Sequence, residues 1–213
     1  MKIIKAGYEI LTAISEGGIE ELQHIERIGR VCYKSEDKIT EDGESAKRFV
    51  QMIIDRGHEA MIEHSSLSVK FIVDRGVSHE LVRHRIASFA QESTRYCNYS
   101  KNKFDNGVTF IKPFFFGEPS TQYDLWKRSM EEAEYCYLHL LESGATPQEA
   151  RSVLPNSTKT EITITANYRE WRNFFKLRTA KAAHPQMREV TIPLLKELKE
   201  RLSIIFDDIA VEE

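Results

Sequence analysis

The sequence predicts an α/β fold in which one domain spans residues 1–213 and an antiparallel or mixed sheet is flanked by helices. Apolar and polar residues alternate over 67–73 and 158–166, which is the period of half-buried strands. Apolar residues recur at helical spacing over 19–31 and 120–143. No repeat, low-complexity tract or linker interrupts the chain, and its length is enough to bury one full core.

The N-terminal part is expected to hold one strand and two amphipathic helices. The predicted elements are a strand over 2–11, a helix over 19–31, a surface loop over 34–43 and a helix over 46–54. Gly57 can terminate the second helix, and His58 then begins the next loop.

The middle of the chain leads from a strand into a segment rich in arginine. The strand over 67–73 is closed by Asp74-Arg75-Gly76, and Ser78 can cap a short helix that carries Leu81 and Val82. The arginine-rich segment is therefore predicted to start on a helix and run into a loop. A short strand over 108–111 and a helix over 120–143, ended by Gly144, follow.

The C-terminal part contains two sequence signals for helix N-termini. Thr146-Pro147-Gln148-Glu149 forms a capping box with proline at the first helical position, which places Arg151 in the second turn. The strand over 158–166 ends at Asn167, an N-cap with Glu170 at the third helical position. The predicted helices are 168–178 and about 186–208, with Pro193 as a kink or start in the second.

Composition excludes several classes of protein. The net charge of −3 gives no global attraction to nucleic acid or to an anionic membrane. The three cysteines, Cys32, Cys97 and Cys136, are scattered and never spaced for a disulfide framework or a metal site, which fits a cytoplasmic protein. The N-terminus lacks a secretory pattern, and no apolar run approaches the ~20 residues of a membrane helix.

The segment Arg83 to Tyr96 is the strongest candidate for a binding site. It combines three arginines, a histidine and three hydroxyl side chains with little apolar material, and only Glu92 opposes the positive charge. Arginine forks suit phosphate or carboxylate, and each charge-assisted contact contributes ~1.5–3 kcal/mol when water is excluded. Because the whole chain is acidic, the segment is expected to bind a small anion.

Arg83-His84-Arg85, followed by seven residues, Ser93 and Arg95-Tyr96, resembles the signature of the flavin-dependent thymidylate synthases. The resemblance extends from Gly29-Arg30-Val31-Cys32-Tyr33 to Arg178. It implies the fold of that family and the reductive methylation of dUMP to dTMP. The one-carbon donor would be methylenetetrahydrofolate and the hydride donor FADH2, which NADPH reduces. It also implies a homotetramer with active sites shared between subunits, with no nucleic-acid or membrane partner.

The resemblance assigns site residues from three parts of the chain. The residues similar to the family's dUMP contacts are Glu80, Leu81, Val82, Arg83, Gln91, Glu92, Ser93, Thr94, Arg95, Arg151 and Arg178. Those similar to its FAD contacts are His58, Ala60, Arg83, His84, Arg85, Gln91, Asn167, Tyr168, Arg169 and Asn173. Arg178 is the candidate catalytic residue, since an arginine at the pyrimidine edge stabilises charge that develops there. No metal is expected.

Some positions depart from the family or have a simpler interpretation. Gln91 stands where some members have glutamate, and it can donate a hydrogen bond as well as accept one. Any flavin contact of Ala60 must use the backbone. Without the resemblance, Arg169 and Arg172 would be interpreted as solvated surface charges. The apolar residues of the same segment are interpreted as core: Trp171, Phe174, Phe175 and Leu177.

Other functions stay open from the residues alone. A hydrolase of phosphate esters or acyl groups would use Ser93 with His84, but no G-x-S-x-G elbow exposes the serine. An RNA-binding module would use Arg83 to Tyr99 as a basic and aromatic patch, but the net negative charge of the chain argues against this function. Cys97 is interpreted as structural, although nearby arginines would favour its thiolate.

Overall fold

The computed structural model describes residues 1–211 and confirms the α/β class. The chain forms two compact units. The first unit comprises Met1–Tyr8, Lys70–Arg83 and Phe89–Thr163, and the second Glu9–Val69, His84–Ser88 and the residues from Ile164 onward. Strands β2, β3, β4 and β6 each contribute residues to both units. That the whole chain forms one domain stays a prediction.

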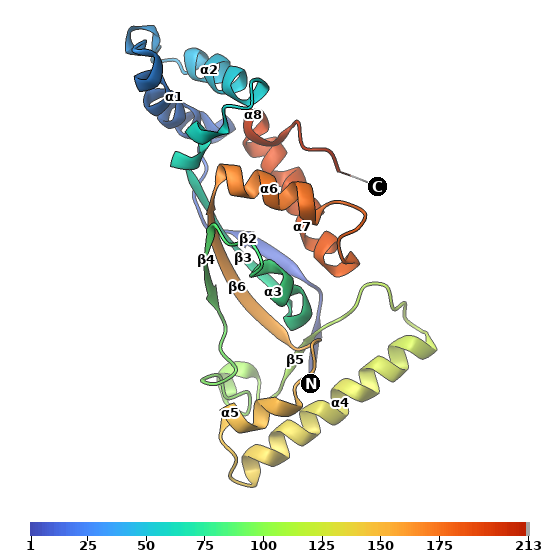
Figure 1. The fold of residues 1–213 in the computed structure, drawn as a ribbon. Helices are drawn as coiled ribbons and strands as arrows, with labels where there is room; N and C mark the ends of the chain where they lie inside the picture. The colour runs from blue at the N-terminus through green and yellow to red at the C-terminus, as the bar shows by residue number, and fades with distance from the viewer. Residues whose placement is uncertain (212–213) are drawn as a thin grey trace. The chain divides into compact units, whose positions relative to one another are not determined.

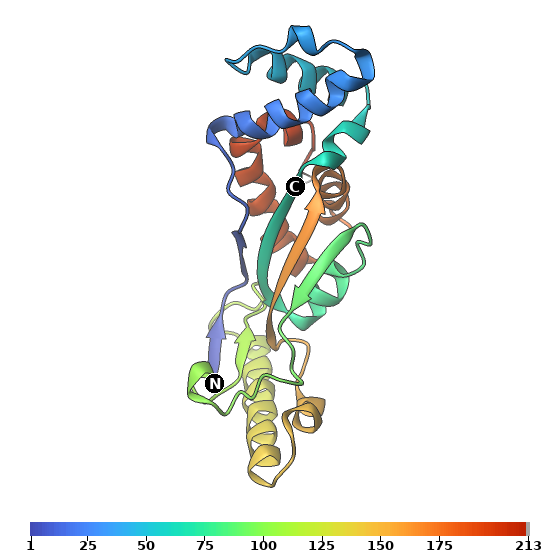
Figure 2. The ribbon, with the colours of Figure 1, turned by 90° about the vertical axis from the view of Figure 1, so that its left-hand side faces the viewer.

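The strands form a four-stranded and a two-stranded sheet. The larger sheet has the order β2 (Gly7–Ile10), β3 (Ser66–Asp74), β6 (Lys159–Asn167) and β4 (Ala87–Gln91). The arrows of β3, β6 and β4 alternate in direction in Figure 2. The smaller sheet pairs β1 (Lys2–Ile4) with β5 (Thr109–Ile111) in parallel. The expected strand over 2–11 is therefore two strands, because the chain changes its pairing partner between Ile4 and Gly7.

The first unit is built around a long helix. Helix α4 (Thr121–Glu142) confirms the helix predicted over 120–143. It begins after Ser120, whose side chain accepts a hydrogen bond from the Tyr123 N–H. Its buried face carries Trp126, Met130 and Tyr137, which belong to one hydrophobic cluster with Phe110 of β5. Beside α4 lie α5 (Pro147–Ala150) and the 3-10 helix Arg151–Val153 (Figure 1). A 3-10 helix at Asn102–Phe104 and α3 (Arg75–Leu81) complete the unit.

The second unit consists mainly of helices. They are α1 (Ile19–Tyr33), α2 (Glu44–Asp55), α6 (Tyr168–Arg178), α7 (Pro185–Arg201) and α8 (Ser203–Phe206), with 3-10 helices at Glu16–Gly18, Glu36–Lys38 and Glu59–His64. Helices α6 and α7 lie side by side (Figure 1). The ring of Trp171 stacks on Phe175, with centroids 5.7 Å apart, and Phe175 meets Phe206 edge to face. Trp171 also donates to the Leu67 carbonyl, which anchors α6 on β3.

Several predicted boundaries are wrong, each for a local reason. Asp74, not Ser78, caps α3, because its carboxylate accepts from the Val77 N–H at 2.7 Å. The loop predicted after the arginines contains strand β4, whose partner β6 lies far along the sequence. The last helix is interrupted at Leu202, where φ is −138° and ψ is 49°.

Two residues of α6 also differ from their predicted surroundings. Arg172 is buried, not solvated, because Asp208 and Glu59 both accept hydrogen bonds from its guanidinium. Leu177 is 55% exposed and does not join the core formed by Trp171, Phe174 and Phe175. The helix turns both Trp171 and Arg172 inward, and the cation is compensated by carboxylates from two other segments.

Candidate functional site

The end of strand β4 places Gln91 against two hydroxyl groups. Its Nε2 donates to Ser78 Oγ at 2.9 Å and to Thr160 Oγ1 at 3.3 Å. Because Ser78 Oγ donates its own proton to the Arg75 carbonyl, this hydroxyl must act as an acceptor toward Gln91. The amide is therefore used as a donor here, which a glutamate could not be at neutral pH.

The negative charge of Glu92 is compensated by partners within the protein. Its Oε1 accepts from the Tyr99 hydroxyl at 2.9 Å and its Oε2 from Lys159 Nζ at 3.0 Å. Lys159 also contacts Glu161 at 2.6 Å. Burial lowers the pKa of Lys159, but the two carboxylates outweigh it and the net shift is upward. The one acidic side chain of the arginine-rich segment is thus held by a charged lysine of β6, which the sequence did not single out.

Ser93, Thr94 and Arg95 form the turn after β4. Ser93 Oγ accepts from the Arg95 N–H at 3.3 Å, and the exposed Arg95 guanidinium lies 5.5 Å from the centre of the Tyr96 ring. Thr94 is buried, and its Oγ1 accepts from Arg151 Nη1 at 3.3 Å. The structure therefore brings together Thr94 and Arg151, two predicted dUMP residues that are 57 positions apart.

The other predicted dUMP residues of the first unit lie at the end of α3. The Leu81 side chain is fully buried, so a ligand can meet this residue only through its backbone. Val82 and Arg83 are exposed, and the Arg83 N–H donates to the Glu80 carbonyl at 3.1 Å. The end of this short helix thus presents one exposed arginine.

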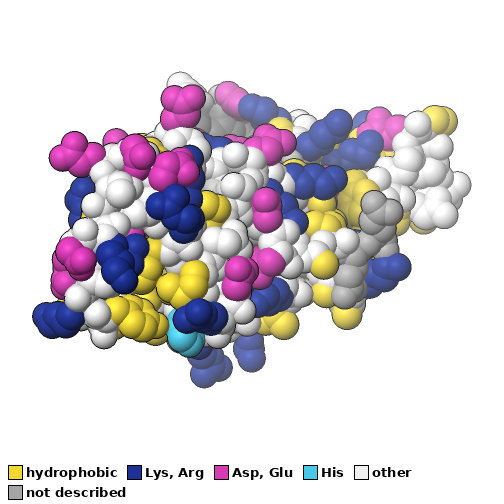
Figure 3. All heavy atoms as spheres, turned by 90° about the horizontal axis from the view of Figure 1, so that it is seen from above, with side chains coloured by type: hydrophobic (Ala, Val, Ile, Leu, Met, Phe, Trp, Pro, Cys, Tyr) yellow, Lys and Arg dark blue, Asp and Glu magenta, His cyan; other side chains and the backbone are white. Residues whose placement is uncertain are grey.

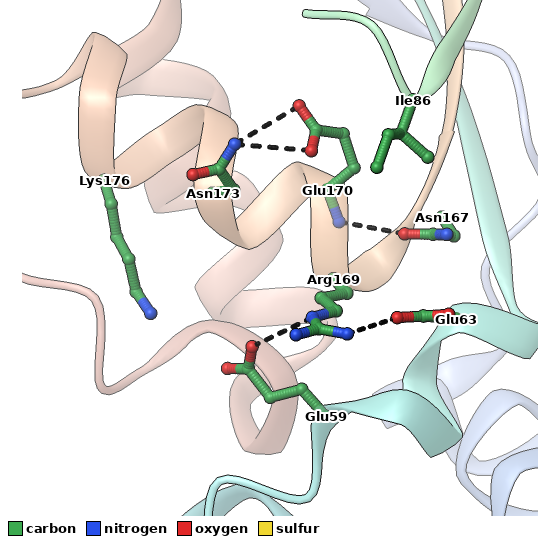
Figure 4. Close-up of a pocket in the computed structure, with 8 residues that line it drawn as sticks. All are labelled: Glu59, Glu63, Ile86, Asn167, Arg169, Glu170, Asn173 and Lys176. Carbon is green, nitrogen blue, oxygen red and sulfur yellow. Dashed lines mark hydrogen bonds and ion pairs between the residues drawn. The ribbon is translucent and has the colours of Figure 1, made fainter.

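The second unit contains a cavity of about 480 Å³ beside α6 (Figure 4). Its lining residues are Glu59, Glu63, Ile86, Asn167, Arg169, Glu170, Asn173 and Lys176. Asn167 caps α6 by accepting from the Glu170 N–H at 2.9 Å, as the sequence predicts. Arg169 forms ion pairs with Glu63 and Glu59 across the cavity, whereas Asn173 donates to Glu170. Three of the predicted FAD residues therefore line one cavity.

His84 connects this cavity to Arg178. The imidazole is buried, with Nδ1 2.9 Å from Glu170 Oε1 and Nε2 accepting from Arg178 Nε at 3.0 Å. The Phe174 ring packs against it at a centroid distance of 4.8 Å. Burial lowers the pKa of His84, the hydrogen bond to Glu170 raises it and the charge of Arg178 lowers it, with a net downward shift. Glu170, predicted only as a residue of the first helical turn, is the link that sequence reasoning missed.

The remaining predicted FAD residues of this unit do not share the cavity. Tyr168 is buried and its side chain lines a separate cavity of about 330 Å³ with His24 and His64. His58 and Ala60 are exposed at the start of the 3-10 helix Glu59–His64. Nδ1 of His58 lies 3.4 Å from the Tyr33 hydroxyl.

The geometry does not support a Ser-His hydrolase. Both ring nitrogens of His84 are engaged, one by Glu170 and the other by Arg178, so His84 is not arranged as a base for Ser93. Burial is the largest influence on Cys97 and raises the pKa of its thiol, as does the nearby Glu92, so the thiolate is disfavoured. Among residues 1–211, no group of three or more His, Cys, Asp or Glu side chains is placed to hold a metal ion.

The face seen in Figure 3 gives no support to an RNA-binding module. On the face in Figure 3, lysine and arginine side chains are interspersed with aspartate and glutamate and form no continuous basic stripe. Within the described part of the chain, no helix is long and apolar enough to cross a membrane.

Comparison with known proteins assigns the family. The family model described as thymidylate synthase complementing protein matches residues 19–202. This chain belongs to the flavin-dependent thymidylate synthase family. A flavin-dependent thymidylate synthase from Corynebacterium aurimucosum is 32% identical over 211 residues, which cover 92% of this chain and 82% of that protein. The enzyme of that name from Pyrococcus abyssi is 34% identical over 169 residues, which cover 79% and 68%.

A solved structure supports the same fold. The UMP/dUMP methylase PolB from Streptomyces cacaoi, bound with 5-Br dUMP, superposes with a TM-score of 0.77 over 97% of this chain and 96% of that one. The sequence identity is 23%, so this likeness concerns the fold. As a flavin-dependent thymidylate synthase family member, the chain carries the Arg83 to Tyr96 signature on β4 and the loops at either end of it.

Proposed function

We propose that this chain makes dTMP by reductive methylation of dUMP, with methylenetetrahydrofolate as the one-carbon donor. FAD, reduced by NADPH, supplies the hydride when bound. The observation that carries the proposal is the pairing of family membership with a polar cavity built from the residues expected to bind flavin.

The cavity beside α6 fits part of a dinucleotide cofactor. Its volume lies within the ~300–1,000 Å³ of small-molecule sites. Three glutamates line it together with two asparagines, Arg169 and Lys176, so an anionic group of the ligand would have to bind at the two cations. Asn167 and Asn173 would bind polar groups of the cofactor. Arg169 would exchange part of its pairing with Glu63 for the anionic ligand. Arg83, Arg85 and Gln91 are further candidate contacts from the arginine-rich segment.

The turn after β4 is the proposed site for the phosphate of dUMP. Ser93 and Arg95 offer a hydroxyl and an exposed fork, and Arg151 is held beside them through Thr94. Lys159 is shared between Glu92 and Glu161, and Arg95 and Arg151 outweigh the one carboxylate charge that is left, so the turn presents net positive charge to the nucleotide. Because both carboxylate oxygens of Glu92 accept bonds within the protein, this residue would contact dUMP through its backbone.

Arg178 is the proposed catalytic residue. Its guanidinium would stabilise negative charge developing at N3 and the neighbouring oxygen of the uracil ring, and so activate the ring for attack. It is already oriented by His84, so little reorganisation would be needed when dUMP binds.

An absorption spectrum of the purified protein, followed by dUMP titration, tests the proposal. We expect a flavin spectrum that dUMP perturbs, and dUMP-dependent oxidation of the reduced flavin when methylenetetrahydrofolate is added. Protein that binds no flavin on reconstitution would refute the proposal.

We also propose a cytoplasmic homotetramer with active sites shared between subunits, as the family resemblance implies. Light scattering coupled to size exclusion should then give four times the chain mass of 24.7 kDa. A monomer that retains full activity would contradict shared sites.

A further inference from the structure

The environment of His84 fixes which of its nitrogens carries the proton. Arginine nitrogens can only donate hydrogen bonds, so the 3.0 Å contact from Arg178 Nε requires an unprotonated Nε2. The proton of the neutral ring then lies on Nδ1, where it is donated to Glu170 Oε1 at 2.9 Å. The opposite tautomer would place an N–H against the N–H of Arg178 and a lone pair against a carboxylate.

We propose that His84 is a positioning residue, which orients the guanidinium of Arg178 through Nε2 and releases it when the ring takes up a second proton. This inference rests on the role of Arg178 in the proposed function. The imidazolium would have N–H groups on both sides, so the contact with Arg178 would become repulsive while the contact with Glu170 would strengthen.

The geometry gives His84 control over the plane of the arginine. A hydrogen bond at Nε restrains the last torsions of a long and flexible side chain, so the imidazole contributes directly to the direction of the fork. The imidazole is itself fixed by Glu170 and by the edge-to-face contact with Phe174. Glu170, Phe174 and Arg178 all lie on α6, so one helix positions the groups on both sides of the imidazole.

The charged groups that face His84 act in opposite directions. Glu170 favours the imidazolium, whereas Arg178 and burial favour the neutral ring, and the net effect is a lowered pKa. The ring is therefore neutral at neutral pH, and the orienting contact is present. As the pH falls through the lowered pKa, the contact is lost.

The first experiment is a pH profile of the dUMP-dependent oxidation of reduced flavin, with rates expressed per bound flavin. The parental kcat should fall about tenfold per pH unit below the pKa of His84. His84→Gln keeps an oxygen that can accept from Arg178 but cannot titrate, so its profile should lose this acidic limb. The matched control is His139→Gln on the exposed side of α4, which should keep the parental profile. An unchanged acidic limb in His84→Gln overturns the proposal.

A second variant separates positioning from packing. His84→Ala should lower kcat about a hundredfold, the effect expected of a displaced catalytic group, and His84→Gln should recover at least a tenth of the parental kcat. Glu170→Gln keeps an acceptor for Nδ1 but removes the charge that favours the imidazolium, so the acidic limb should move to lower pH. A limb that moves to higher pH contradicts the proposal.

The tautomer can be measured without any turnover. In nitrogen-15 spectra of the flavin-loaded protein at neutral pH, Nδ1 of His84 should appear protonated and Nε2 unprotonated, and Arg178→Lys should shift the Nε2 resonance. A protonated Nε2 overturns the inference even if the variants are inactive. If the parental protein makes no dTMP but this tautomer is observed, the proposed function fails and the orienting contact stands.

Discussion

Glu92 illustrates how a single residue is fitted into a segment of opposite charge. A carboxylate beside three arginines would weaken an anion site, yet Lys159 and Tyr99 bind both of its oxygens. Lys159 compensates the charge of Glu92, so the segment keeps a net positive charge. The hydrogen bond from Tyr99 holds the turn after β4 in place. Lys159 is therefore expected to matter for nucleotide binding, although it lies in β6 and is far from the signature in sequence.

Replacing Lys159 with alanine should weaken dUMP binding roughly tenfold, because the negative charge of Glu92 would no longer be compensated beside the proposed phosphate site. Calorimetric titration of the flavin-loaded variant with dUMP measures this. Lys127→Ala, an exposed lysine of α4, is the control and should bind as the parental protein does. An unchanged dissociation constant for Lys159→Ala would show that Glu92 does not need neutralising.

Arg178→Lys keeps the positive charge but loses both the planar fork and the Nε donor to His84. If the lost stabilisation is ~3–4 kcal/mol, turnover should fall by roughly two to three decades. Flavin content should stay parental, since Arg178 is assigned to the uracil ring. Loss of flavin from Arg178→Lys, or turnover at the parental rate, would contradict this assignment.

Formation of dTMP should not require a cysteine. Burial raises the pKa of the Cys97 thiol. Desolvation, followed by the charge of Glu132, raises the pKa of the Cys136 thiol, whereas Cys32 is exposed on α1. A variant with all three replaced by alanine should keep turnover within about twofold of the parental rate. A folded, dUMP-binding variant that makes no dTMP would refute this expectation.

At the level of elements, α6 carries most of the proposed chemistry. Asn167 begins it, Glu170 and Asn173 meet at the cavity, and Arg178 ends it beside His84. At about 100° per residue, Arg178 lies on a different side of the helix from Asn173. His84 connects the two sides, because it contacts both Arg178 and Glu170, to which Asn173 donates. The opposite face packs Trp171 and Phe175 into the core, so the helix is rigid where ligands would bind.

The buried Arg172 holds α6 to the C-terminal segment, and Arg172→Ala should lower the free energy of unfolding by about 3 kcal/mol. Its guanidinium donates to Asp208, Glu59 and the Ile205 carbonyl. Thermal or denaturant unfolding measures the loss, and Arg56→Ala, at the exposed end of α2, should change it little. Equal stability of the two variants would contradict a structural role for the pairing.

The same pairing predicts a pH dependence of stability. The hydrogen bond from Arg172 is the largest influence on Asp208 and lowers the pKa of that carboxyl below 3.8. The pairing therefore stabilises the fold above this pKa, and its contribution disappears as the pH falls through the lowered value. The stability difference between the parental protein and Arg172→Ala should shrink as the pH falls below 3.8 and through the lowered pKa of Asp208. A difference that grows in that range would contradict the assignment.

Periodicity predicted the long elements well because their burial is one-sided. Thr158, Thr160, Ile162, Ile164 and Ala166 are all buried, as their alternation predicts, and the helix over 168–178 has the predicted bounds. Strand β4 was missed because its stability comes from pairing with β6, which no local pattern reveals. For the same reason the motif located the Arg83 to Tyr96 segment, whereas Lys159 and Glu170 became visible only through their three-dimensional partners.

At the level of the whole molecule, the two units divide the candidate residues between them. Most predicted dUMP residues belong to the first unit, whereas Arg178 and most predicted FAD residues belong to the second. The sequence predicted both sets through its resemblance to a family, but it could not predict the contacts within each set. The contacts that the sequence did not reveal join residues that are far apart along the chain, such as Thr94 with Arg151 in the first unit and His84 with Arg178 in the second.

A single-turnover reaction decides whether the flavin-loaded protein methylates dUMP. Protein carrying reduced flavin would be mixed without oxygen with dUMP and methylenetetrahydrofolate, and the nucleotide products would be separated and quantified. The account predicts close to one dTMP per bound flavin, with flavin oxidation at the same rate. Reduced flavin that stays reduced in the presence of bound dUMP and the folate, with no dTMP formed, would contradict it.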